Sequence, residues 1–313
     1  MVGEAMANSV AVIGGTGFVG RHVAEELAHA GFDPLILSRG RNAELRSDHR
    51  SRVVDIADGA ESLRKAISGS IAAINAASHV GDDAREQRRV NVDGVTHTAE
   101  ATTSLGIPLV HVSTAGIYGA LAFSGGREGQ YPVHPESELS ATRARGDAVA
   151  SASGASVLRP LFITGVGDGH FLLRLLSAHA ALGAWIEDGA ARLSVASAGL
   201  VARAAVAAVR HRLEGGAGAV VHVVPDRPVA VRDLLSPILA EWGRLPSRSL
   251  SAADAGAALE ARGIPARKVV QFAHDYFLSS ERLRDLVPDA GSRDVHLTDA
   301  ALSWYVQHGR SAR

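Results

Sequence analysis

The chain of 313 residues contains no cysteine. This excludes disulfide bonds, thiolate metal sites and a cysteine nucleophile, and it argues against secretion by a disulfide-dependent route. No stretch reaches about 18 uninterrupted apolar residues, so we expect no membrane-spanning helix. The charge is nearly balanced, with 32 basic and 33 acidic residues, so nothing in the composition indicates a nucleic acid or an anionic membrane as partner. We therefore expect a cytoplasmic protein that acts on a small molecule.

Residues 10–20 form the strongest local pattern in the chain. The apolar run 10–13 is followed by GGTGFVG at 14–20 and then by an apolar helical face. In this strand, turn and helix, Gly14 allows the tight turn, Gly17 lets the backbone approach a pyrophosphate, and Gly20 lets the helix and strand pack closely. We expect a dinucleotide to contact Gly14, Thr16, Gly17, Phe18, Val19 and Gly20.

The end of the next strand bears on which dinucleotide is bound. The apolar run 34–37 ends at Ser38 and Arg39, and Arg41 follows. An acidic residue in this region binds the ribose hydroxyls of NAD, whereas arginine accommodates the 2′-phosphate of NADP. Arg39 and Arg41 can pair with that phosphate, and Arg39 can stack on adenine. This predicts NADPH rather than NADH; the alternative is a solvated loop with two arginines.

Further strands alternate with helices, which predicts an α/β fold with a parallel sheet. Strands are expected at 52–56, 71–77 and 108–114, and helices at about 61–67 and 85–105. Further cofactor contacts are expected at the ends of these strands, at Asp55, Ile56, Ala76 and Ala77. Asp55 can accept a hydrogen bond from adenine, and the small residues Ala76 and Ala77 suit a backbone that passes close under a ligand. Core packing and helix capping are the alternative roles for these positions.

Six motifs follow one another along the chain: the glycine turn at 14–20, the turn at Asp55, Asn91-Val92, Ser113-Thr114 with Tyr118-Gly119, Leu158-Arg159-Pro160, and 278–286. Their order resembles that of the extended short-chain dehydrogenase/reductase family. The resemblance implies a Rossmann doubly wound parallel sheet with NAD(P) lying across it, and a smaller, mainly helical C-terminal lobe that closes over the substrate. The dinucleotide domain is then 1–165, completed by about 198–225, and the substrate lobe is 166–197 with 226–313. Dimers are common in this family, and the sequence leaves the oligomeric state open.

The chain departs from this family at its catalytic pair. Family members carry Tyr-x-x-x-Lys on the helix after the fifth strand, but here that helix begins Ser140-Ala-Thr-Arg-Ala-Arg-Gly-Asp147. Alignment places Ala141 at the tyrosine position and Arg145 at the lysine position, where the cation would hold the nicotinamide ribose. Alanine has no proton to transfer, which disfavours an epimerase or dehydratase, since those reactions need a strong base.

Three groups could complete a carbonyl reduction without that tyrosine. Thr114, at the catalytic Ser/Thr position of the family, can hydrogen-bond the carbonyl oxygen. Tyr118 is close in sequence and is a candidate acid. The third source is the substrate itself, through a phenolic hydroxyl beside the ketone and a solvent proton.

The substrate pocket is expected to form beside the sixth strand, at 156–163. Its end should run past the nicotinamide ring, which adds Ser113, Pro160, Leu161 and Ile163 to the cofactor contacts. No HExxH pattern or carboxylate cluster occurs, so we expect no metal. The expected substrate contacts are Ser78, His79, Thr114, Tyr118, Phe162, His170 and Phe171. For the apolar residues among them, plain core packing is the alternative role.

The sequence thus predicts an NADPH-dependent ketoreductase with an altered active site. It looks like the reductases that tailor polycyclic aromatic polyketides, angucyclinones among them, with an aromatic ketone as its small-molecule substrate. A non-catalytic NADP(H)-binding sensor or regulatory protein is the alternative from another class. A nucleotide-sugar epimerase or dehydratase that uses another base is a weaker alternative.

Overall fold

The computed structural model describes residues 8–40, 50–119, 123–266, 269, 271–290 and 296–309. Its centre is a seven-stranded sheet in the order β12-β7-β5-β4-β1-β2-β3, in which all neighbours are parallel. The strands are β1 (Ser9–Ile13), β2 (Asp33–Ser38), β3 (Arg50–Val53), β4 (Ala72–Asn75), β5 (Leu109–Val112), β7 (Ser156–Pro160) and β12 (Val220–Val223). The predicted Rossmann-like α/β fold is confirmed.

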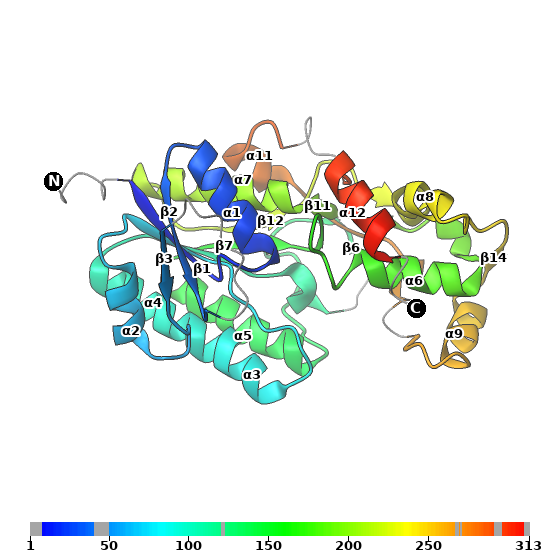
Figure 1. Ribbon diagram of the computed structural model, residues 1–313, viewed down its shortest axis with the longest axis horizontal. Coiled ribbons are helices and arrows are strands. Elements are labelled where there is room, and N and C mark those ends of the chain that lie inside the picture. The colour runs from blue at the N-terminus through cyan, green and yellow to red at the C-terminus, as the bar shows by residue number, and fades with distance from the viewer. Residues whose placement is uncertain are drawn as a thin grey trace.

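Helices cover both faces of this sheet, as Figure 1 shows. Every residue of β1 is buried, and its side chains alternate between two apolar clusters. Val10 and Val12 pack under α1 (Phe18–His29) and α7 (Ala198–Leu213). The opposite face is covered by α2 (Ala60–Ile67), α4 (Gly94–Leu105) and α5 (Glu138–Ala152).

The single helix expected at 85–105 is interrupted. Asp83 caps α3 (Ala84–Arg88) by accepting hydrogen bonds from two backbone N–H groups. A π-helical turn, η1 (Arg89–Asp93), then leads into α4. The wider turn places Asn91 in a buried position next to the end of β4.

A C-terminal lobe lies beyond the carboxyl ends of the sheet strands, on the right in Figure 1. Its helices are α6 (Leu172–Leu182), α8 (Val231–Glu241), α9 (Ala252–Glu260) and α12 (Asp299–Gly309), with α11 (Glu281–Leu286) against the main sheet. The lobe is mainly helical, as predicted, and it also holds a four-stranded sheet of β13 (Val229–Ala230), β10 (Arg192–Leu193), β15 (Tyr276–Leu278) and β6 (Phe123–Gly126). Strands of two to four residues are too short to show an alternating pattern of apolar residues, so they could not be predicted from the sequence.

Two short strand pairs lie outside these two sheets. β8 (Phe162–Thr164) pairs with β11 (Val195–Ser197), and β9 (Trp185–Ile186) pairs with β14 (Ser249–Leu250). The longer elements of the described chain are also linked by short helical turns, which are η2 (Ala115–Tyr118), η3 (Glu187–Gly189) and η4 (Gln271–Ala273). In the part of the chain that the structure describes, no helix is long and apolar enough to cross a membrane.

Candidate active site

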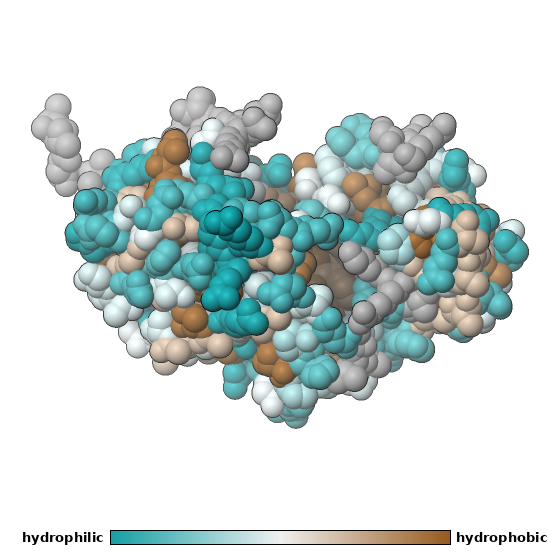
Figure 2. Space-filling view, turned by 90° about the horizontal axis from the view of Figure 1, so that it is seen from below, coloured by the Kyte–Doolittle hydropathy of each residue, from teal (hydrophilic) through white to brown (hydrophobic). Residues whose placement is uncertain are grey.

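A cavity of about 430 Å³ lies where the main sheet meets the C-terminal lobe. The molecule is visibly hollowed between its two halves in Figure 2. The position fits the rule that ligands of open parallel sheets bind outside the carboxyl ends of the strands. Many expected site residues line the cavity: Gly14, Thr16, Gly17, Phe18, Val19, Ser38, Arg39, Ile56, Ala76, Ala77, Ser78, His79, Ser113, Leu161, Phe162, Ile163, His170 and Phe171.

The glycine turn forms one wall of the cavity. Gly14 has φ +76°, and a Cβ there would lie 2.7 Å from the Cα of Ala77. Gly20 lies behind the cavity wall, and a Cβ there would lie 2.1 Å from the Gly14 carbonyl oxygen. Gly17 is the N-cap of α1 and supplies no side-chain cap, so the first N–H groups of the helix are open to a ligand. This cradle fits the pyrophosphate of a dinucleotide.

The end of the cavity beside β2 carries one arginine. Arg39 lines it, with a side chain that is 48% exposed and whose Nη1 lies 3.9 Å from Glu86 Oε2. Arg41 lies outside the described residues. Asp55 does not line the cavity: its carboxylate accepts hydrogen bonds from Arg89 Nη2 and the Ala57 N–H, each at 3.0 Å. Burial raises the pKa of Asp55, but the Arg89 hydrogen bond and charge outweigh this and hold it below its usual value. The expected contact of Asp55 with adenine stays a prediction, and Arg89 holds the carboxylate in place.

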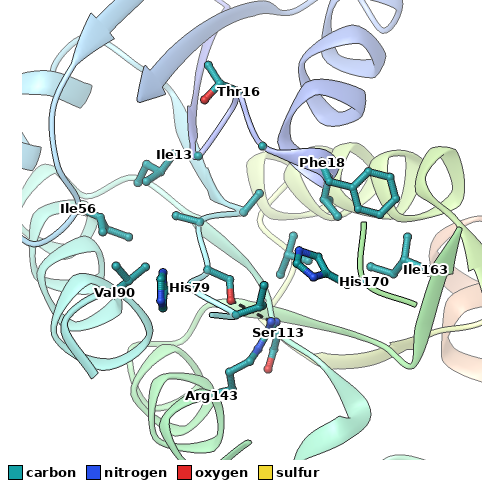
Figure 3. A pocket seen from close by; sticks show the side chains of 18 of the residues that line it. Ile13, Thr16, Phe18, Ile56, His79, Val90, Ser113, Arg143, Ile163 and His170 are labelled. Carbon is teal, nitrogen blue, oxygen red and sulfur yellow. Dashed lines mark hydrogen bonds between the residues drawn. The ribbon is translucent and has the colours of Figure 1, made fainter. Parts of the chain in front are cut away.

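A second arginine in the cavity, Arg143, was not among the residues predicted from the sequence. Arg143 points from α5 toward Ser113 in Figure 3, and its Nη1 donates a hydrogen bond of 2.9 Å to Ser78 Oγ. Burial lowers the pKa of Arg143 to about 10. Arg145 is instead 54% exposed and lies 3.7 Å from Glu138.

Helical phase explains this correction. Two residues along an α-helix turn the side chain by about 200°, so Arg143 and Arg145 cannot face the same site. The family spacing, counted back four residues from Arg143, puts Leu139 rather than Ala141 at the tyrosine position. Neither residue carries an acidic proton, so the tyrosine is absent under both alignments.

Tyr118 does not reach the cavity, contrary to the expectation that it contacts substrate. The turn η2 directs it into the core, where it is 1% exposed. Its hydroxyl accepts a hydrogen bond of 2.8 Å from Arg159 Nη1 and lies 2.9 Å from His222 Nε2. Thr114 starts the same turn, and its Oγ1 accepts a hydrogen bond from the Gly116 N–H at 3.0 Å. Neither Thr114 nor Pro160, which is buried within β7, lines the cavity.

Aromatic rings form the wall toward the C-terminal lobe. Phe162 and Phe171 stack with centroids 4.6 Å apart and an interplanar angle of 12°, and Phe272 meets both edge-on. His170 lies beside Ile163 at this end in Figure 3. A flat apolar ligand fits such a wall better than a strongly hydrated one does.

A polar cluster fixes the loop that follows β4. The Asn91 side chain accepts a hydrogen bond from the His79 N–H at 2.9 Å and donates one to the His79 carbonyl oxygen at 2.9 Å. Ser78 Oγ lies 3.3 Å from Asn91 Oδ1, so the partner of Arg143 is itself held in place. Elsewhere, among the described ranges, no three histidine, aspartate or glutamate side chains gather as a metal site.

The arrangement of the glycine turn and the sheet agrees with a match to a known protein family. Residues 10–223 match the NAD dependent epimerase/dehydratase family. The chain belongs to this family. A nicotinamide dinucleotide is therefore the cofactor that its glycine cradle is built to hold. The comparison with curated proteins found no match.

Solved structures of the same fold include two 4-epimerases and another enzyme that binds NAD. The Bordetella bronchiseptica enzyme WbmG in complex with NAD has a TM-score of 0.74 at 17% identity, over 99% of this chain and 97% of that one. UDP-glucose 4-epimerase from Brucella ovis in complex with NAD has a TM-score of 0.73 at 20% identity, over 97% and 98%. The UDP-Glc/GlcNAc 4-epimerase from Campylobacter jejuni has a TM-score of 0.73 at 13% identity, over 98% and 100%. At these identities the likeness establishes the shared fold.

Proposed function

We propose that this family member is an NADP(H)-dependent reductase that converts a ketone on a flat, polycyclic aromatic substrate of the polyketide type to an alcohol. The observation that carries the proposal is a cavity with a cation but no phenolic acid. None of the chain's four tyrosines, all of which lie in the described ranges, lines it. A reaction in this cavity therefore has no tyrosine as its proton donor, and the proposed source of the proton is the substrate or solvent.

The residues of the cavity divide between cofactor and substrate. The glycine turn and the start of α1 would hold the pyrophosphate, and Arg39 would pair with a 2′-phosphate, which favours NADP over NAD. When bound, the reduced dinucleotide supplies a hydride. The Phe162–Phe171 stack would hold the aromatic rings of the substrate, and the loop at Ser78 and His79 would border its reacting end.

A hydroxyl beside the ketone would replace the missing tyrosine. Such a phenol already hydrogen-bonds the carbonyl oxygen and is placed to give it a proton as charge develops, after which solvent restores the phenol. A substrate that lies against the apolar wall would be partly shielded from water there, which would strengthen this internal hydrogen bond.

The test is NADPH oxidation, followed by absorbance, on paired polycyclic ketones that differ only in a hydroxyl beside the carbonyl. We expect reduction of the hydroxylated member at a rate at least tenfold above the other. Leu139→Tyr, which restores a phenol four residues before Arg143, should narrow this difference, whereas Ala141→Tyr serves as the matched control. Equal rates for the paired ketones in the wild type would exclude the substrate as proton donor.

Nucleotide-sugar epimerisation or dehydration is the second candidate, because several structural neighbours carry that activity in their names. It needs a base that the cavity does not provide among its tyrosines. Incubation of UDP-sugars with catalytic amounts of NAD(P)⁺, followed by chromatography, decides between the two. Tight NADPH binding without turnover in either assay would support the third candidate, a non-catalytic sensor.

A further inference from the structure

Arg143 is a cation without a carboxylate partner. In the described part of the chain, no acidic oxygen lies within ion-pair distance of its guanidinium, and its one hydrogen bond goes to Ser78 Oγ. The nearest acid along the same helical face is Asp147, one turn later. Both Asp147 oxygens are already engaged, since Arg159 binds them through Nε and Nη2 and Ser113 Oγ donates to Oδ2.

The surroundings make this cation unusual. A guanidinium has five N–H donors, and with one used by Ser78 the others are available to a ligand in the cavity. The walls around it are largely apolar, with Val90, Val112 and Leu161 among the lining residues. A positive charge in such a site interacts more strongly with an anion than it would in water.

We propose that Arg143 binds the oxygen anion of the substrate and is a catalytic residue of this enzyme. The inference rests on the proposed reductase function and gives it a substrate class: aromatic ketones whose carbonyl oxygen, or the hydroxyl beside it, becomes anionic during the reaction. In the reaction the carbonyl carbon gains a C–H bond with the two electrons that NADPH supplies and is reduced. The C=O π pair moves to the oxygen, which Arg143 stabilises until the neighbouring hydroxyl protonates it and solvent re-protonates that hydroxyl.

The proposal predicts a charge preference that can be measured without turnover. With the enzyme saturated by NADP⁺, isothermal titration calorimetry compares 2-naphthoate with 2-naphthamide, which share shape and differ in charge. We expect the wild type to bind naphthoate at least tenfold more tightly, because hydrogen bonds to charged groups exceed neutral ones by about that factor. Arg143→Gln should lose the preference, and Arg143→Lys should keep part of it.

Arg145→Gln is the matched control, since it removes the same charge two residues away on the solvent side of α5 and should retain the preference. Circular dichroism establishes that each variant is folded, and the comparison of the two ligands within each variant cancels the charge of the cofactor. On a ketone that is reduced, Arg143→Gln should lower kcat, measured at saturating NADPH, by about 10²- to 10³-fold.

The outcomes separate the two proposals. A wild type that shows no preference for naphthoate, or an Arg143→Gln variant that keeps it, overturns the assignment of Arg143. A preference that depends on Arg143, together with no reduction of any ketone, leaves Arg143 as an anion-binding residue and overturns the reductase function instead.

Discussion

Tyr305, near the C-terminal end of the described chain, donates a hydrogen bond of 2.8 Å from its hydroxyl to Oδ2 of Asp168 in the cavity wall. Asp168 also accepts hydrogen bonds from the N–H groups of His170, Phe171 and Leu172, which begin α6. Burial raises the pKa of Tyr305 above its usual value, so the hydroxyl stays protonated and remains a donor. This bond joins α12 to the wall of the active site.

Tyr305→Phe should therefore weaken the fold around the cavity. The change leaves the Gly165 N–H, which donates to the Tyr305 hydroxyl at 3.1 Å, without a partner as well. We expect the free energy of unfolding, measured by urea denaturation, to fall by about 1–3 kcal/mol. Asp168→Ala, which removes four hydrogen bonds, should cost more. Equal stability of Tyr305→Phe and the wild type would mean that the bond does not support α12.

Substitutions in the buried Asp147–Arg159 ion pair should strongly lower the stability of the fold. The two side chains are 3% and 11% exposed, so removing one charge leaves the other buried and unpaired. We expect Asp147→Asn to lower the free energy of unfolding by about 3–5 kcal/mol. Glu61→Gln breaks an exposed pair with Arg64 and serves as the control, with no measurable loss expected. A small effect of Asp147→Asn would show that water or another acid compensates Arg159.

Stability should decline in mild acid because buried histidines are held in the neutral form, and the effect is largest at His111 and His222. Burial lowers the pKa of His111 and of His222 to about 4 from an ordinary value of 6.5. Between these values the unfolded chain binds more protons than the folded one, so the free energy of unfolding falls as the pH drops from about 6.5 to about 4. The loss is about 3 kcal/mol for each histidine.

Urea denaturation at pH 7 and pH 4 measures this effect. His111→Leu should remove about half of the pH dependence that the two histidines cause. His29→Gln, at an exposed position of α1, should leave it unchanged. A profile for His111→Leu that coincides with that of the wild type would mean that His111 is already protonated or accessible in the folded state.

Cofactor preference should depend on Arg39. If its guanidinium pairs with a 2′-phosphate, Arg39→Ala removes a charge-assisted interaction that is made with NADPH alone. We expect the Kd for NADPH, followed by nucleotide fluorescence, to rise about 10- to 100-fold. The Kd for NADH in the same variant is the internal control and should stay within about twofold. A parallel loss of both affinities would assign Arg39 to adenine stacking rather than to phosphate recognition.

The cofactor cradle was readable from the sequence because it is local. The left-handed turn at Gly14 and the packing of Gly20 against it involve residues close along the chain, and glycine at these positions is the signal; only the approach of Ala77 to Gly14 is a distant contact. The parallel sheet followed from the alternation of apolar runs with helical patterns for the same reason. Short strands such as β10 and β15 carry no such pattern and could not be foreseen.

Only the tertiary structure decided which polar groups meet in the cavity. Arg143 and Arg145 differ by two positions in sequence, and it is the packing of α5 against the sheet that turns one inward and the other to solvent. Tyr118 follows the expected motif, yet Arg159 and His222, which are 41 and 104 residues away, hold its hydroxyl in the core. Spacing along the chain fixes elements and their turns, whereas side-chain orientation depends on distant contacts that a single sequence does not reveal.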